Sequence, residues 1–365
     1  MNRSHRIQRV APAVLITLTL ALAAGLPAWA DFEERREIRA DSLTVTNLIG
    51  EVRIEGHGGS SFQIVVNVRG RDGTRENISI ESVEGDPAKL AVVFPLDRES
   101  RYVYPKMAGG RTTISVSDSN MSWLGKLVGD VLGKRVTITG SGKGLEVWAD
   151  MEIRIPSGGA LTMNLGVGEI NAENVDGDLR LDTNSGHVNA AGINGDLNVD
   201  TGSGHVEARN VDGELLVDTG SGHVVLNNVR GNSVNVDTGS GHVEMDEVDS
   251  PVIRVDTGSG HVEAMQLSTD SANIDTGSGS VTLQLDRMGD GDYRIDTGSG
   301  RIVLVLPADA SVDVTAETGS GGIEVDLEQG VEIRRREEDE ISFSVGGGRS
   351  RVRLDTGSGS IRITR

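Results

Sequence analysis

The chain has 365 residues, a formal net charge of −20 and no cysteine. Such an acidic surplus repels nucleic acid and anionic lipid, so neither is an expected partner. The lack of cysteine excludes a fold stapled by disulfides. Only 3% of the residues are aromatic and 49 are glycine, which favours a narrow, regular architecture over a large mixed core.

Residues 1–30 predict a secretory signal peptide. Arg3, Arg6 and Arg9 form a positive segment, an apolar run "VAPAVLITLTLALAAGL" follows, and "AWA" precedes Asp31, as expected of a cleavage site. The apolar run is short for a membrane anchor. We therefore expect an exported protein, periplasmic or extracellular, with no transmembrane segment after cleavage.

Residues 31–163 predict an N-terminal β region, because "SLTVTNLIGEVRIEG" and "SFQIVVNVRG" alternate apolar and polar residues. We expect this region to cap the rest of the chain and cover an open sheet edge. An insertion at 106–146 interrupts it. Within the insertion, the apolar spacing of residues 121–133 predicts a short amphipathic helix, packed as a cap or, alternatively, used to bind a membrane surface or a partner.

Residues 164–365 repeat with a period of 18–21 residues. Each unit reads strand, turn, strand, turn, since apolar residues alternate on both sides of a glycine-rich turn. A unit of this length has no room for a helix. The pattern predicts an all-β fold, a single-stranded parallel β-solenoid of about ten coils stacked about 4.8 Å apart. The aspartate of the recurring "DTGSG" marks the units at Asp182, Asp200, Asp218, Asp237, Asp256, Asp275, Asp296 and Asp355, with Glu317 and Asn164 in degenerate copies.

A hydrophobic residue followed by Asp-Thr-Gly is also the signature of an aspartic protease. That chemistry needs two carboxylates that face each other on two lobes, whereas a solenoid places all copies in one column. We instead expect the aspartate, as at Asp200, to cap the turn by accepting N–H groups of the following residues. Calcium is the alternative, although the calcium β-roll places its aspartate after the glycines. The calcium candidates are Asp182, Asp200, Asp218, Asp237 and Asp256.

Five of the seven histidines occupy one position of the repeat. Three interpretations stay open: a solvated outward column, a partly protonated column that offsets aspartate repulsion, or a zinc-type metal column, although structural zinc wants four ligands. In the unit around 200, Thr201 and Val206 are expected in the core and His205 outside. We predict no cofactor, with calcium or zinc as the alternative. The histidine candidates are His187, His205, His223, His242 and His261.

The C-terminal stretch is basic, in contrast to the acidic repeat. Residues 164–305 hold 24 Asp or Glu against 7 Lys or Arg, while the last strands carry Arg351, Arg353, Arg362 and Arg365. We expect these arginines to close the rod and to protect its final edge from aggregation.

Four stretches together resemble a known family: "VTNLIGEVRIEG", "MEIRIPSGGALTMNLGVGEI", the serial "DTGSGHV" units and the final "RLDTGSGSIRI". They are similar to the bacterial putative-adhesin β-repeat domain of unknown function, over nearly all of the chain after residue 30. The resemblance implies an exported or envelope-facing protein, in some cases linked to envelope stress, and it implies no catalytic residues.

Two classes of function follow. The first is a non-enzymatic scaffold that presents a regular acidic face to an envelope or surface protein or a glycan. The second is a polysaccharide-acting enzyme on a β-helix, whose active site should break the repeat. Only 106–146 and 328–349 break it, so the even coils between them favour the scaffold.

Overall fold

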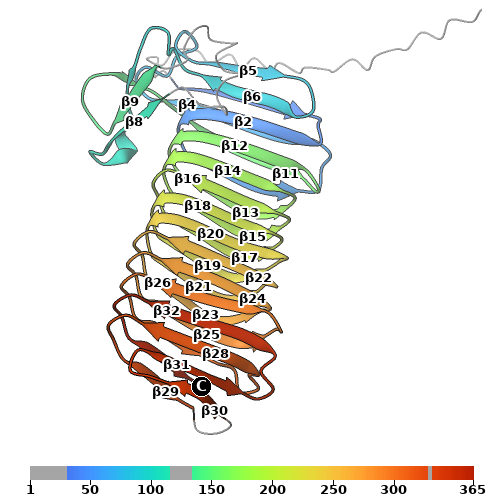
Figure 1. Ribbon diagram of the computed structural model, residues 1–365. Coiled ribbons are helices and arrows are strands. Elements are labelled where there is room, and N and C mark those ends of the chain that lie inside the picture. Colours follow the sequence, from blue (N-terminus) through green and yellow to red (C-terminus); the bar gives the residue numbers. More distant parts are fainter. Residues whose placement is uncertain (1–30, 116–133, 328–330) are drawn as a thin grey trace, which may run out of the picture.

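The computed structural model describes residues 31–115, 134–327 and 331–365, which wind into a flattened β-solenoid (Figure 1). One chain forms the whole winding, and each regular coil contributes one strand to each of two large sheets, here called sheet A and sheet B. The predicted all-β parallel solenoid is confirmed. Each regular coil has two strands, in agreement with the strand, turn, strand, turn pattern of the unit.

Sheet A begins with antiparallel pairs at the N-terminal end and continues with parallel strands. Its order is β1 (Phe32–Ile38), β4 (Phe62–Arg69), β11 (Trp148–Pro156), β3 (Val52–His57), β13 (Ile170–Asp176), β15 (Val188–Asn194), β17 (Val206–Asp212), β19 (Val224–Arg230), β21 (Val243–Asp249), β23 (Val262–Thr269), β25 (Val281–Met288), β27 (Ile302–Val305), β33 (Ile361–Thr364) and β29 (Ile323–Asp326).

Sheet B has antiparallel pairs at both ends and parallel strands between them. Its order is β5 (Ser79–Val83), β6 (Ala88–Val93), β2 (Ser42–Ile49), β12 (Ala160–Val167), β14 (Leu179–Ser185), β16 (Leu197–Thr201), β18 (Leu215–Ser221), β20 (Ser233–Ser240), β22 (Val252–Thr257), β24 (Ser271–Thr276), β26 (Asp292–Thr297), β32 (Ser350–Thr356), β28 (Val312–Thr318), β31 (Glu340–Val345) and β30 (Val331–Arg336).

The predicted insertion at 106–146 contains strands in its described part. The 3₁₀ turn η1 (Pro105–Met107) leads into sheet C, whose order is β10 (Leu145–Glu146), β7 (Arg101–Val103), β9 (Arg135–Thr139) and β8 (Arg111–Ser115). Residues 116–133 lie outside the described residues, and so does the whole of the helix predicted at 121–133. Residues 1–30, with the predicted signal peptide, also lie outside. In the described part of the chain, no helix is long and apolar enough to cross a membrane.

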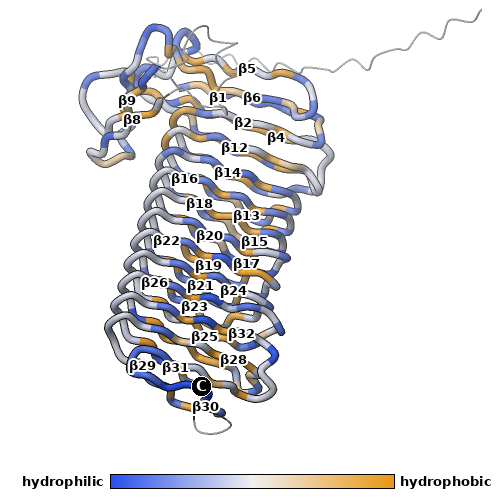
Figure 2. The backbone as a smooth tube through the Cα atoms, in the orientation of Figure 1, coloured by the Kyte–Doolittle hydropathy of each residue, from blue (hydrophilic) through white to orange (hydrophobic). Residues whose placement is uncertain are grey.

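Small aliphatic side chains fill the space between sheets A and B. Val199 and Val217 of sheet B are fully buried, as are Val206 and Ala208 of sheet A, because period-two alternation sends every second side chain inward. Figure 2 shows this alternation as hydrophobic bands that repeat along the strands of each coil. The same two sheets continue across residue 163, so the predicted cap and repeat region share one core.

Each early strand of sheet A bends at one residue with a left-handed backbone. The φ angles are 52° at Asn174, Asn210 and Asn228, 56° at Glu247 and 54° at Gln266. Asparagine tolerates this region better than most residues, and β15 has Gly192 at the same position with a φ of 68°. In the later coils, the register of the stack holds glutamate and glutamine in the same conformation.

The glycines of "DTGSG" are required by the close stacking of the turns. A Cβ added to Gly222 would lie 1.9 Å from the carbonyl oxygen of Gly204, and one added to Gly260 would lie 1.7 Å from that of Gly241. The carbonyl of each coil occupies the volume that a side chain of the next coil would need. The motif therefore repeats because the turns stack in register.

The C-terminal coil does not close the rod, so that prediction is wrong. Strand β32 pairs in parallel with both β26 and β28, and β33 pairs with both β27 and β29. The last coil in the sequence is therefore inserted between two earlier ones (Figure 1). Sheet B instead ends in the antiparallel hairpin β30–β31, formed by the unit that has lost the "DTGSG" motif.

The arginines of the inserted coil contact acidic residues of both neighbouring coils. Arg351 pairs with Asp292 at 3.2 Å, Arg353 with Glu317 at 3.8 Å, and Arg362 with Asp326 at 3.6 Å. All of these side chains are largely exposed, so each pair contributes at most about 1 kcal/mol. The positive charge of these arginines complements the acidic coils on both sides of the inserted strand.

Candidate functional site

The most regular surface is the edge where each sheet-B strand turns into the following sheet-A strand. The chain makes this turn through Gly-Ser-Gly and then reaches the histidine position, as at residues 202–205 and 220–223. We call the stacked turns of residues 184–187, 202–205, 220–223, 239–242 and 258–261 the GSG edge. In the central coil around 200, Thr201 and Val206 are buried and His205 is exposed, as predicted.

The five histidines of this edge form one continuous stack, here called the His ladder: His187, His205, His223, His242 and His261. Successive ring centroids lie 5.0, 4.9, 4.9 and 5.0 Å apart, with interplanar angles of 3°, 8°, 16° and 3°. The spacing follows the coil separation, because each ring lies on the ring of the preceding coil. All five side chains are exposed at the surface.

Every ring also accepts a hydrogen bond from the next coil. The backbone N–H of His205 donates to Nδ1 of His187 at 3.1 Å, that of His223 to His205 at 3.1 Å, and that of His242 to His223 at 3.3 Å. The N–H groups of His261 and Ser280 continue the series at 3.2 and 2.9 Å. Since Nδ1 must keep its lone pair, the ring is neutral and its proton is on Nε2.

The Nδ1 hydrogen bonds favour neutral rings over a partly protonated column, which is one of the three interpretations that the sequence left open. Burial lowers the pKa of His205, and repulsion by the neighbouring His187 and His223 lowers it further. A proton on Nδ1 would also face the N–H of the next coil and remove that hydrogen bond.

The aspartates also form a column, but they do not cap the turn. Asp182, Asp200, Asp218, Asp237 and Asp256 pair with one another inside the sheet-B strands, with their side chains on the outer face. Burial, followed by repulsion from the neighbouring aspartates of the column, raises the pKa of Asp200, Asp218 and Asp237. Like charges in register thus make the column electrostatically unfavourable.

Threonine makes the turn hydrogen bonds that were expected of aspartate. In the later coils, Oγ1 of Thr276 accepts the N–H of Gly279 at 3.0 Å and donates to the carbonyl of Gly260 at 3.1 Å. Thr297 repeats both contacts, at 3.0 and 2.8 Å. In these two coils the turn N–H therefore bonds to threonine and not to the expected aspartate, because alternation points threonine inward towards the turn and aspartate outward.

The described residues contain no group of three or more His, Asp or Glu side chains arranged to hold a metal ion. In the His ladder the Nδ1 lone pair of each neutral ring accepts a backbone N–H, so a metal at Nε2 would require the ring proton to move to Nδ1, which would remove that hydrogen bond. Binding of calcium or zinc by the Asp and His candidates stays a prediction.

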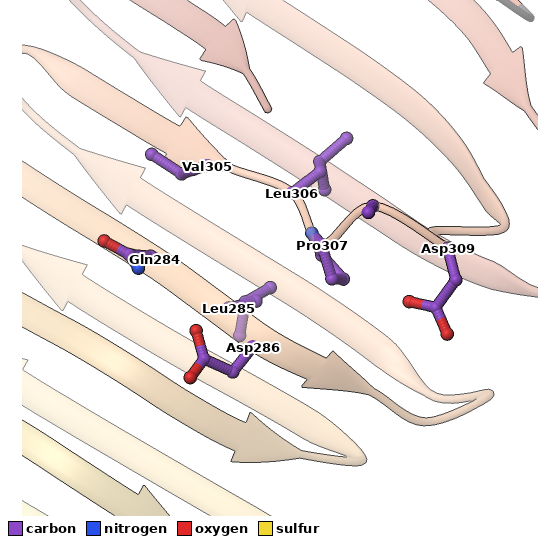
Figure 3. A pocket seen from close by; sticks show the side chains of 8 residues that line it. Gln284, Leu285, Asp286, Val305, Leu306, Pro307 and Asp309 are labelled. Carbon is purple, nitrogen blue, oxygen red and sulfur yellow. The ribbon is translucent and has the colours of Figure 1, made fainter.

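A recess of about 470 Å³ lies elsewhere, where the chain leaves β27 through Pro307 (Figure 3). Asp286 and Asp309 line it from different segments, beside Leu285 and Leu306. Neither lies in the 106–146 or 328–349 segments where an enzyme site was expected. The lining includes no serine, threonine, histidine or lysine, so its only ionisable side chains are these two carboxylates.

These features define a two-sheet parallel β-solenoid that presents columns of identical side chains in register. The model of the Toastrack DUF4097 family matches residues 60–364, which identifies the family within this class of fold. The chain belongs to that family, which confirms the predicted kinship with a repeat domain of unknown function.

Solved structures resemble this chain over most of its length. A putative cell adhesion protein from Clostridium sporogenes is 12% identical with a TM-score of 0.23, and covers 92% of this chain and 99% of its own. A putative adhesin from Bacteroides fragilis is 11% identical with a TM-score of 0.36, covering 93% and 98%. A putative lipid binding protein from Parabacteroides distasonis is 14% identical with a TM-score of 0.40, covering 90% and 96%. No curated protein matches the chain.

Proposed function

We propose that this protein is an exported, non-enzymatic scaffold of the bacterial envelope or cell surface, which binds a partner through its regular face. The observation that carries the proposal is the GSG edge, where five coils present the same side chains at intervals of 4.9–5.0 Å. Periodic presentation suits an extended or repetitive partner, whereas catalysis needs one unique cluster. The family kinship and the signal-like residues 1–30 support export.

A fractionation and binding experiment tests the proposal. The full chain is expressed in a bacterial host, and its location and N-terminus are determined by fractionation and mass spectrometry. The purified exported protein is then incubated with washed cell envelopes and pelleted. We expect removal of residues 1–30, recovery outside the cytoplasm and saturable sedimentation with envelopes. Cytoplasmic retention or the absence of binding contradicts the proposal.

The enzyme alternative predicts a different result. A screen against envelope and plant polysaccharides would show turnover, and substitution of Glu or Asp within 106–146 or 328–349 would abolish it. The metal alternative predicts that calcium or zinc raises the melting temperature and that EDTA lowers it between pH 5 and 8. A flat response leaves the solenoid as a metal-independent scaffold.

A further inference from the structure

We propose that the His ladder is a binding surface for an extended, uncharged β-linked glycan, with each ring donating its Nε2–H to an oxygen of successive sugars. The inference rests on the proposed scaffold function and deepens it, since it names the surface and the chemical class of the partner. Three properties of the GSG edge carry it: a fixed donor geometry, an uncharged strip between acidic flanks, and the spacing of the coils.

The donor geometry is fixed before any ligand arrives. Stacking holds the rings nearly parallel, with interplanar angles between 3° and 16°, and the N–H bond of the next coil holds Nδ1 in place. Because Nδ1 is the acceptor, the remaining proton of each neutral ring lies on Nε2. Five exposed rings thus form a row of N–H donors whose side-chain freedom is already restricted, which lowers the entropic cost of binding.

The charge pattern selects the class of partner. Apart from Asn184, the GSG edge carries glycine, serine hydroxyls and imidazoles whose Nδ1 accepts a backbone N–H, and Ser203, Ser221 and Ser240 are exposed beside the ladder. Acidic side chains flank it on both sheets, with Asp218 and Asp237 on sheet B and Glu244 on sheet A exposed. Phosphate- or sulfate-bearing polymers are repelled by such flanks. An uncharged polymer rich in oxygen acceptors meets no such barrier.

The spacing of the ladder separates a glycan from an extended peptide. Residues that face the same side of an extended peptide repeat at about 6.6 Å, so a peptide falls out of step with rings 4.9–5.0 Å apart after one or two coils. One sugar of an extended β-linked chain advances by close to one coil spacing. A second copy of this solenoid shares the coil spacing too, and is the competing occupant that the experiment must distinguish.

Serine is the substitution that removes the projecting imidazole Nε2–H and keeps an acceptor for the hydrogen bond between coils. At the next position of the same column, Ser280 Oγ accepts the backbone N–H of Arg301 at 3.3 Å, as the histidine Nδ1 atoms do in their coils. The variant H205S/H223S/H242S should therefore keep the contact between coils and lose three Nε2–H donors. A matched control, N198A/N235A/N273A, removes three polar side chains from the outer face of sheet B in neighbouring coils.

The experiment measures the binding of soluble cello- and chito-oligosaccharides of two to six sugars by calorimetry at pH 7.5. We expect affinity to rise with length up to five sugars. Each hydrogen bond accounts for roughly a two- to tenfold change, so the serine variant should bind the hexamer at least about tenfold more weakly. The asparagine control should bind as the wild type does, and circular dichroism and melting temperature should show that both variants fold.

Equal affinity in the serine variant, no rise with length, or no binding of either oligosaccharide series overturns the inference. Sedimentation equilibrium supplies the competing outcome: a dimer that the serine variant abolishes would assign the ladder to a second copy and also overturn it. The envelope-pelleting experiment distinguishes failure of the glycan inference from failure of the proposed scaffold function. If the serine variant still pellets with envelopes like the wild type, the scaffold function stands and the ladder is not its binding surface.

Discussion

Substitution of Gly260 by alanine tests whether close stacking of the turns explains the repeat. The new Cβ would lie 1.7 Å from the carbonyl oxygen of Gly241, so the two coils must separate locally. That carbonyl belongs to the same stack as the inter-coil bonds from Val243 N–H to the His261 carbonyl at 2.9 Å and from Gly258 N–H to the Thr238 carbonyl at 3.1 Å. Overpacking typically costs about 1–3 kcal/mol and each weakened hydrogen bond about 1 kcal/mol more. We expect a loss of about 3 kcal/mol or more in unfolding free energy.

Gly322→Ala is the matched control, because Gly322 follows a Gly-Ser-Gly turn in another coil and a Cβ there meets nothing within 4 Å. It should change stability by less than about 0.5 kcal/mol. Repeat proteins can unfold in parts, so hydrogen exchange at the Val243 and Val262 amides should accompany urea unfolding. If Gly260→Ala is as stable and as well protected as Gly322→Ala, the stacking explanation is refuted.

Four further predictions concern the columns and the chain order. Because the folded state lowers the pKa of His205, the unfolded chain binds more protons just below pH 6.5, so stability should fall as pH drops from about 6.5 through that lowered pKa; a melting series in which H205S removes none of this fall would contradict it. The raised pKa values of Asp218 and Asp237 have the opposite sign, so D218N and D237N should each raise stability at pH 7 by less than about 1 kcal/mol, and the gain should vanish on acidification below the ordinary aspartate pKa. Thr276→Val should cost about 1–2 kcal/mol because it removes two turn hydrogen bonds, whereas Thr219→Val should be neutral or stabilising since the buried Thr219 hydroxyl has no partner; equal urea midpoints would argue against threonine capping. Removal of residues 349–365 should abolish cooperative folding of the C-terminal coils, because β32 and β33 lie between strands on both sides; a truncated chain with native exchange protection at Ile295 would disprove this.

The repeat made the solenoid and its buried columns predictable. Alternation around Thr201 and Val206 placed those residues in the core and His205 outside, as the structure has them. The same alternation also indicated which side chain lies beside the turn N–H groups, although the sequence analysis assigned that role to aspartate. Since Thr201 and its equivalents point inward and the aspartates outward, threonine was the residue placed to bond the turn.

The order of the C-terminal coils could not be read from period alone. The strands 312–318 and 350–356 have the same apolar pattern, and either can lie on β26 with the same inward set. The structure selects β32, which places the strand bearing Arg351 and Arg353 between coils that carry Asp292 and Glu317. The antiparallel return of β31 onto β28 also accounts for the loss of the motif there.

The sequence by itself determined the class of fold and the residue types of each column, because local alternation and stacking sterics act through every unit in the same way. Only the tertiary structure decided which contacts the residues of one coil make with those of the next. Stacking at 4.9–5.0 Å brings Nδ1 of each ladder histidine onto the N–H of the next coil, and this contact fixes the tautomer, keeps the rings neutral and aims their remaining protons outward. The chemical state of a ladder depends on contacts between coils 18–19 residues apart in sequence, which no single repeat unit contains.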